Sequence, residues 1–195
     1  MTSAELQSLR IDLAQRGKWN LGYFVSGFIF WSFVLVVNFI LPLETARIYW
    51  LVGSFFIFPM AVAASRVIQA DPFCRGNELG ELVGYTHMSV ITMTFPLVIA
   101  AFVYFPNALL LVMAIAYCVD FYVMSWAFGS PLCGIHAAIR TIAVTVIWFA
   151  LPNLRLTAIP AVVALAYLLT VVIAPSLRRQ WLSKRAGATG SGSAA

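Results

Sequence analysis

The sequence has 195 residues, of which 62% are hydrophobic and only 10% are charged. Soluble domains average about 45–50% apolar and about 25% charged residues, so this composition excludes an ordinary soluble domain and indicates an integral membrane protein. The formal net charge of +5 comes from basic residues that flank apolar segments, as is typical of membrane proteins. We therefore expect a lipid bilayer as partner and no nucleic acid.

The chain begins with a predicted amphipathic helix in residues 1–18. Thr2 and Glu5 have the spacing of a capping box, which satisfies backbone groups at the start of a helix. The apolar side of this helix is formed by Leu6, Leu9 and Leu13. Such a helix either lies at the membrane surface or caps the end of the bundle, and the sequence leaves both alternatives open.

Apolar segments of about 20 residues follow, each long enough at 1.5 Å per residue to cross a hydrocarbon core of about 30 Å. The segments are residues 21–41, 48–67, 82–104, 108–128, 133–151 and 157–174. The predicted fold class is therefore all-α, a polytopic membrane helix bundle with six transmembrane helices in a domain of residues 19–176. Pro59 should kink the second of these helices. We expect a basic tail in residues 177–186 and a flexible linker or cloning scar in residues 187–195.

Basic residues are distributed unevenly between the two sides of the predicted bundle. One side would hold Arg10, Arg16, Lys18, Arg66, Arg75, Arg178, Arg179, Lys184 and Arg185. The other side would hold only Arg47 and Arg155. By the positive-inside rule, both termini should be cytoplasmic in a multi-pass protein of the inner (plasma) membrane. An odd number of helices would separate the basic ends of the chain, so the charge distribution agrees with six.

Asp120 lies inside the fourth apolar segment, where a carboxylate costs roughly 2.5–3.5 kcal/mol on insertion scales. Something must compensate it, and Arg140 in the fifth segment is the best partner by sequence. A short turn joins the two segments, so we expect antiparallel neighbouring helices with these residues at similar depth. The pair is either part of a functional site or a structural ion pair that keeps two helices in register.

Two histidines and several tyrosines fall at a similar depth. His136 is one helical turn from Arg140 on the same face, and His87 lies near the cytoplasmic end of the third segment. Tyr85 and Tyr117 can supply hydroxyl groups. We therefore predict a polar cavity, open to the cytoplasm, in which these side chains surround a substrate or a proton. The alternative for each histidine is a hydrogen bond to a backbone carbonyl.

A metal site is a weaker interpretation of the same segment. Cys133 and His136 are spaced as C-x-x-H, and His87 and Asp120 could complete four ligands. This spacing often occurs by chance and Cys133 lies at the end of its segment, so we expect no metal and no cofactor.

The polar loop before the third segment contains Gly76, Gly80 and Gly84 at intervals of four residues. It is not a G-x-G-x-x-G motif after a strand, so a nucleotide site is not indicated. We expect a loop that caps the third helix, with Glu78 and Glu81 at its N-terminus. The alternative is that this loop forms the rim of the cytoplasmic cavity.

Four further motifs are Phe58-Pro59, the Gly-Asn-x-Leu-Gly sequence at 76–80, Phe95-Pro96 and the aromatic-rich segment 117–126. With these motifs the chain resembles a family of small uncharacterised bacterial integral membrane proteins with six helices. The resemblance extends over roughly residues 5–175. It implies six transmembrane helices, but it implies no activity and no site residues.

The function predicted from the sequence is a small membrane transporter or channel-like protein that binds a small solute or a proton in this cavity. A homo-oligomer is expected, because six short helices enclose little volume. One alternative is a membrane-embedded enzyme acting on a lipid or isoprenoid head group, with His87 or His136 as general base and Arg140 binding phosphate or carboxylate. Another is an accessory subunit in which the polar cluster is structural. The sequence leaves open whether the protein is an enzyme.

Overall fold

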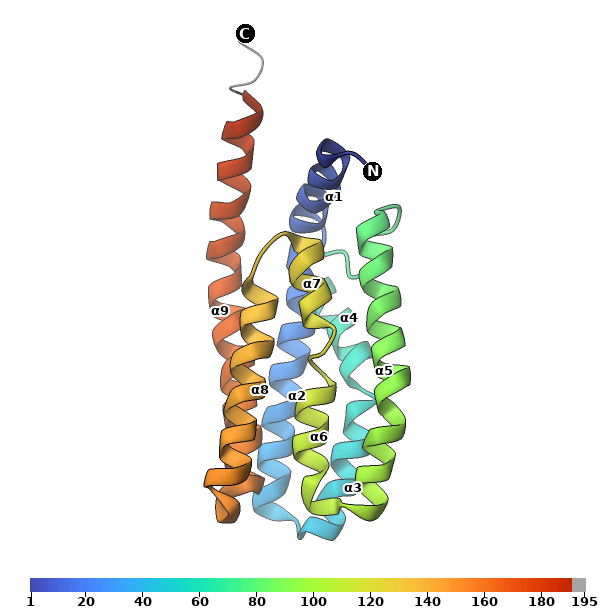
Figure 1. Cartoon of the computed structure of the whole chain (residues 1–195), viewed down its shortest axis with the longest axis vertical. Coiled ribbons are helices and arrows are strands. Elements are labelled where there is room, and N and C mark those ends of the chain that lie inside the picture. The colour runs from blue at the N-terminus through green and yellow to red at the C-terminus, as the bar shows by residue number, and fades with distance from the viewer. Residues whose placement is uncertain (191–195) are drawn as a thin grey trace.

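The computed structural model describes residues 1–190, which form a bundle of helices without a β-strand in that range (Figure 1). The predicted all-α class is therefore confirmed. The α-helices are α1 (Ser3–Gln15), α2 (Leu21–Ile40), α3 (Leu43–Ser54), α4 (Ile57–Val67), α5 (Glu78–Tyr104), α6 (Leu109–Ala116), α7 (Phe121–Phe128), α8 (Leu132–Ala150) and α9 (Arg155–Gly190). Short 3₁₀ turns occupy Lys18–Asn20, Pro106–Ala108 and Pro152–Leu154. Both ends of the chain lie at the same end of the bundle (Figure 1).

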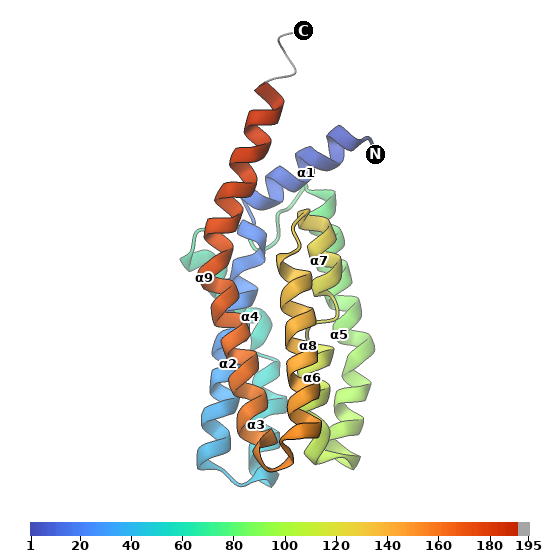
Figure 2. The ribbon, with the colours of Figure 1, turned by 60° about the vertical axis from the view of Figure 1, so that its left-hand side comes forward.

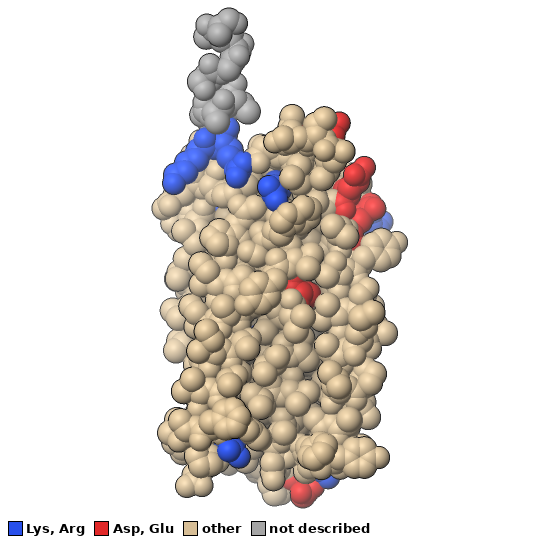
Figure 3. Space-filling model, viewed as in Figure 1, with Lys and Arg blue, Asp and Glu red and all other residues tan. Residues whose placement is uncertain are grey.

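The outer surface of the bundle is apolar around its middle. Figure 3 shows the charged side chains of one face gathered mainly at the two ends, with a broad belt between them in which a single small acidic spot is visible. Large apolar side chains point outward in this belt; Met93, Leu97 and Ile142, for example, are 78%, 62% and 64% exposed. Five helices of the described chain are long and apolar enough to cross a membrane, and the bent pair α3–α4 could supply a sixth crossing. An apolar exterior of this extent is expected where lipid, not water, covers the protein.

The helix bounds agree closely with the sequence where the apolar run has sharp limits. The first and fifth predicted segments, 21–41 and 133–151, correspond to α2 and α8. The second segment is bent by 52° between α3 and α4, at Phe55 and Phe56. Pro59 explains the position of the break, because a proline lacks the N–H that would bond to the carbonyl four residues earlier, at Phe55.

The fourth predicted segment is the main correction to the expected helices. Residues 108–128 were expected to form one transmembrane helix. Pro106–Phe128 is long and apolar enough to be one span, but its α-helical winding is interrupted, because α6 ends at Ala116 and α7 begins at Phe121. The Cys118 N–H donates to the Ile115 carbonyl three residues back, at 3.1 Å, so the α-helical pattern stops there. Neither proline nor glycine lies in this interruption, which is why the sequence did not reveal it.

The last helix is longer than the predicted sixth segment. α9 continues through Pro175 and includes residues 177–186, which were predicted to be a basic tail. The backbone of residues 187–190 also belongs to α9, whereas residues 191–195 of the predicted linker lie outside the described part of the chain.

The N-terminal helix α1 crosses the end of the bundle at an angle to the other helices (Figure 2). The predicted capping box is present, because the side chains of Thr2 and Glu5 each accept a hydrogen bond from the backbone N–H of the other residue. Arg10 Nη2 donates to the Trp126 carbonyl of α7 at 2.7 Å, and Arg178 of α9 donates to the Ala14 carbonyl at 2.9 Å. α1 therefore packs on the bundle as a cap, and its position at a membrane surface stays a prediction.

Asn77 is the centre of the Gly-Asn-x-Leu-Gly motif and connects α1 to α5. Its side-chain oxygen accepts from the Gly80 N–H at 3.1 Å and caps α5, as expected for this loop. Its side-chain nitrogen donates to the Leu9 carbonyl at 2.9 Å and to Asp12 Oδ2 at 2.7 Å. A Cβ atom at Gly80 would lie 3.0–3.3 Å from atoms of Cys74 and Leu13, so the glycine allows this close packing. The motif thus has a structural role at the end of the bundle.

Candidate functional site

The interruption between α6 and α7 places a carboxylate inside the bundle. Asp120 is the residue before the first turn of α7, and it is only 3% exposed. Its side chain makes no capping bond to α7, so the carboxylate is available to another partner. A carboxylate buried at this depth is costly unless a cation or a proton neutralises it.

The partner of Asp120 is His87 of α5. His87 Nδ1 and Asp120 Oδ2 lie 2.6 Å apart, and the His87 side chain is 15% exposed. The predicted ion pair between Asp120 and Arg140 is wrong: among the described residues, the ion pairs do not include Arg140. A histidine and a carboxylate that share a hydrogen bond can hold one proton between them and then carry no net charge.

Arg140 of α8 instead supports the interruption in α6–α7. Its Nη2 donates to the Ala114 carbonyl at 2.5 Å, and its Nη1 donates to the Tyr167 hydroxyl at 2.6 Å. The Ala114 carbonyl lies in the last turn of α6, where the helix dipole favours a cation. The guanidinium also lies over the rings of Trp31 and Tyr167, at 5.7 and 5.1 Å from their centroids. These contacts explain how a 1% exposed arginine is accommodated without a carboxylate.

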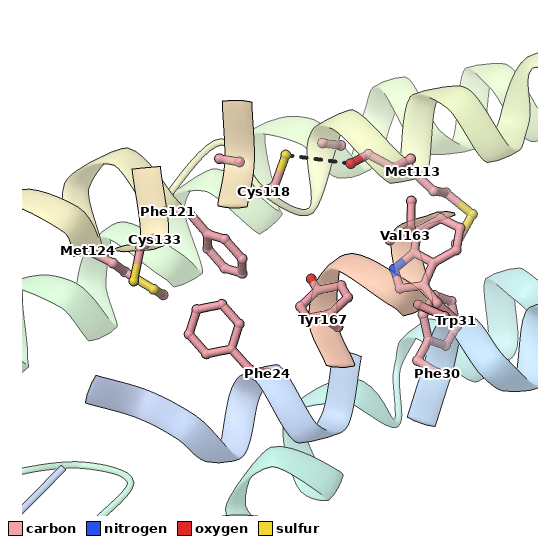
Figure 4. Close-up of a cluster of buried hydrophobic side chains, with 14 of the residues drawn as sticks. Phe24, Phe30, Trp31, Met113, Cys118, Phe121, Met124, Cys133, Val163 and Tyr167 are labelled. Carbon is pink, nitrogen blue, oxygen red and sulfur yellow. Dashed lines mark hydrogen bonds between the residues drawn. The ribbon is translucent and has the colours of Figure 1, made fainter. Parts of the chain in front are cut away.

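His136 belongs to an aromatic cluster and not to the Asp120 pair. Its Nδ1 lies 2.8 Å from the Thr170 hydroxyl, which itself donates to the Ala166 carbonyl, so the histidine is the donor between them. Its ring contacts Phe24, Phe121 and Tyr167, with centroid distances of 4.6–5.4 Å. Figure 4 shows these three aromatic side chains converging from α2, α7 and α9. The four titratable residues therefore do not form the predicted single cluster: His87 pairs with Asp120, whereas His136 and Arg140 each contact Tyr167.

Two cavities meet at His87. The first, of about 380 Å³, lies beside the loop before α5 and includes Arg75 and Glu81 in its lining; we call it the terminal cavity. The second, of about 370 Å³, lies deeper and includes Asp120 in its lining; we call it the inner cavity. Both are lined by Tyr23, Phe58, His87 and Met88. The His87–Asp120 pair therefore lies where one cavity adjoins the other.

The two predicted tyrosines lie in different cavities. Tyr117 lines the inner cavity, in the interruption between α6 and α7. Tyr85 lines the terminal cavity and is 75% exposed. Neither Arg140 nor His136 is among the residues that line either cavity.

Tyr167 and Gly27 are functional candidates that the sequence analysis missed. Tyr167 lines the inner cavity and also bonds Arg140, so it separates the buried cation from the cavity. Its ring lies so close to Gly27 of α2 that a Cβ atom there would overlap it. A tyrosine in a wholly apolar segment and a glycine on a facing helix were the available signals, but the sequence does not show which helices face each other.

Titratable side chains on several elements lie near the His87–Asp120 pair. These are Tyr23 of α2, Tyr117 before α7, Cys133 of α8 and Tyr167 of α9. In the described part of the chain, no group of three or more His, Cys, Asp or Glu side chains is placed to hold a metal ion.

The loop beside the terminal cavity lies outside the apolar belt. Asp71 Oδ1 accepts from the N–H groups of Phe73 and Cys74, at 3.0 Å each, and thereby shapes the turn. Burial, followed by the neighbouring Asp71 carboxylate, raises the pKa of the Cys74 thiol to about 11. Cys74 is therefore an inert structural thiol in the folded protein.

Comparison with known proteins identifies the family of the chain but no characterised relative. No curated protein and no solved structure matches the chain. A protein-family model, described as a family of unknown function (DUF7010), matches residues 6–175. This range begins within α1 and ends at Pro175 of α9, so it includes the interruption, both cavities and the Asn77 motif. The chain therefore belongs to the family of unknown function DUF7010.

Proposed function

We propose that this protein is a six-span transporter of the inner membrane, with both termini in the cytoplasm. In this proposal a small solute occupies the inner cavity and the His87–Asp120 pair exchanges a proton during transport. The bent pair α3–α4 counts as one crossing, which agrees with the two termini lying at the same end of the bundle. The excess of lysine and arginine at that end supports its cytoplasmic position.

The observation that carries the proposal is an interrupted helix that brings a carboxylate to a cavity. A helix that breaks within the hydrocarbon region exposes backbone groups, and it is tolerated where it lines a cavity or is buried in protein. Discontinuous helices of this kind form the solute and ion sites of many transporters. Here the inner cavity is bordered by residues at two breaks, Ser54 and Phe55 at the end of α3 and Tyr117 and Asp120 between α6 and α7.

The two adjoining cavities support a route for the solute. The terminal cavity lies next to the loop before α5, near the end of the bundle that holds the termini. A solute entering there would reach the inner cavity past Tyr23, Phe58 and His87, which line both. Any solute on this route would therefore contact the titratable pair.

Transport is favoured over the enzyme alternative because of Arg140. The enzyme proposal used Arg140 to hold a phosphate or carboxylate, but its guanidinium is occupied by Ala114 and Tyr167 and lies outside both cavity linings. The homo-oligomer expected from the sequence stays a prediction.

Liposome flux tests the proposed function. The purified protein would be reconstituted with a pH-sensitive dye inside the liposomes, and a pH gradient would be imposed with a panel of cationic, neutral and anionic solutes. We expect at least one solute to produce proton flux that falls at least tenfold in Asp120→Asn, because the amide cannot exchange the proton. Glu44→Gln is the matched control, because Glu44 is an exposed carboxylate outside both cavities.

Flux variants would be compared only if they elute as a single species in detergent, so that loss of folding is not read as loss of transport. Equal flux in wild type and Asp120→Asn, or no flux with any solute class, would refute the proposal.

A further inference from the structure

We propose that the inner cavity binds an organic cation, a substituted ammonium group carrying apolar substituents. This inference rests on the transport function proposed above and names the class of solute. It depends on two features of the inner cavity: its aromatic lining and the negative charge that the Asp120 carboxylate of the His87–Asp120 pair can carry there.

Aromatic rings dominate the lining of the inner cavity. Besides Tyr23 and Phe58, which it shares with the terminal cavity, they are Trp31, Phe55, Phe95, Tyr117, Phe121 and Tyr167. The faces of such rings attract cations, and sites for quaternary ammonium ligands are built from several rings together. The remaining side chains of the lining are mostly aliphatic, so an ion without apolar substituents would lose its hydration there and gain little in return.

Asp120 determines which charge the aromatic cavity accepts. Among the described residues, it is the only acidic side chain of the lining, and no described lysine or arginine lines this cavity. When the His87–Asp120 pair has lost its shared proton, the lining carries one negative charge, which a monovalent organic cation would neutralise. Arg140 does not line the cavity, although its guanidinium lies over Trp31 and Tyr167, two rings of the lining. Its hydrogen bonds go to the Ala114 carbonyl and the Tyr167 hydroxyl, so the cation has to be held mainly by the other rings and by Asp120.

The approach to the inner cavity is also aromatic. Phe73, Phe58, Tyr23 and His87 form a row of rings with successive centroid distances of 6.5, 6.3 and 5.1 Å. Phe73 lines the terminal cavity and His87 borders both, so the row leads from one cavity to the other. A cation with apolar substituents would meet ring faces along this path until it reached the carboxylate.

Three probes that share a benzyl group separate charge from apolar contact. They are benzyltrimethylammonium, its neutral carbon isostere neopentylbenzene, and the anion phenylmethanesulfonate. Binding to the purified full-length chain in detergent would be measured by calorimetry at pH 8. We expect the cation to bind at least tenfold more tightly than either other probe, because only the cation is attracted both by the ring faces and by the carboxylate of Asp120.

Variants then locate the bound cation. Asp120→Asn should weaken benzyltrimethylammonium at least tenfold, and Tyr117→Leu should weaken it about three- to tenfold through loss of one ring face. Tyr122→Leu is the matched control, because Tyr122 is a 57% exposed tyrosine of α7 outside the cavity lining. This variant should bind benzyltrimethylammonium as tightly as the wild type does.

The outcomes distinguish this inference from the proposed function. Equal binding of all three probes, tighter binding of the anion, or equal loss in Tyr117→Leu and Tyr122→Leu would overturn the cation site, even if a neutral solute or anion is transported. Selective cation binding that is lost in Asp120→Asn supports the site, even if liposome flux is absent and the transport proposal fails.

Discussion

Replacing Asn77 should release α1 from the end of the bundle without unfolding the rest. Asn77→Ala removes the cap of α5, worth about 1 kcal/mol. It also removes the hydrogen bond to the Leu9 carbonyl, worth about 1 kcal/mol, and the bond to the Asp12 carboxylate, worth about 1.5–3 kcal/mol. Because the Asp12 side chain is 38% exposed, water replaces part of the last bond. We therefore expect the free-energy cost of detaching α1 from the bundle to be about 2–3 kcal/mol lower in Asn77→Ala than in the wild type.

The thiol of Cys74 reports this detachment. It is 2% exposed and packs beside Gly17 and Leu13, so movement of α1 away from the bundle should make it accessible. With its pKa raised to about 11, the buried thiol holds almost no thiolate at pH 8, and detachment restores ordinary reactivity. A cost lower by about 2–3 kcal/mol should raise the alkylation rate of Cys74 about 30- to 150-fold.

The rate would be measured with N-ethylmaleimide and peptide mass spectrometry, which distinguishes Cys74 from the buried Cys118 and Cys133. Asn107→Ala is the control, because Asn107 is an exposed asparagine in the turn at the other end of the bundle. If Cys74 reacts equally fast in wild type and Asn77→Ala, while Cys118 and Cys133 stay protected, Asn77 does not hold α1 and our account of the motif fails.

Three further predictions follow from buried groups and close contacts. His87→Ala should lower the free energy of unfolding by about 3–5 kcal/mol, because it leaves Asp120 buried without a partner. Adding Asp120→Asn should restore stability in thermal unfolding, and no recovery in the double variant would contradict the pairing. Gly22→Ala should lower the free energy of unfolding by about 1–3 kcal/mol, because its methyl group would overlap Ser65 of α4. Gly84→Ala, with open space around it, should instead raise the free energy of unfolding by up to about 1 kcal/mol, because alanine favours a helix more than glycine does. Exchange of a proton for benzyltrimethylammonium predicts a binding heat that differs between phosphate and Tris buffers; equal heats would exclude such exchange.

The sequence predicted helix positions well because hydropathy and length determine them. α2 and α8 match the predicted segments to within one residue at each end. The break between α3 and α4 was also foreseen, since Pro59 leaves a visible mark in the sequence. The break between α6 and α7 was not, because it is held by tertiary contacts such as the bond from Arg140 to the Ala114 carbonyl.

The candidate site was predicted in its depth but not in its pairing. His87 and Asp120 were expected in one layer, and they do meet. Arg140 was assigned to Asp120 because opposite charges at similar depth attract. That assignment requires knowing which side of each helix faces inward, and segments that are apolar on all sides carry no such information. The interruption at residues 117–120 also turns Asp120 away from the direction that a continuous helix would give it.

The close contact between Gly27 and Tyr167 determines how far the Tyr167 ring lies from α2, and so limits the width of the inner cavity. A methyl group at Gly27 would displace the Tyr167 ring, and Arg140 would then lose its hydrogen bond to the Tyr167 hydroxyl. The glycine at position 27 therefore affects three features together. They are the width of the inner cavity, the position of Arg140 and the interruption between α6 and α7 that Arg140 supports. A substitution at Gly27 of α2 should therefore change the size of solute that the inner cavity accepts, although α2 contributes no charged side chain to its lining.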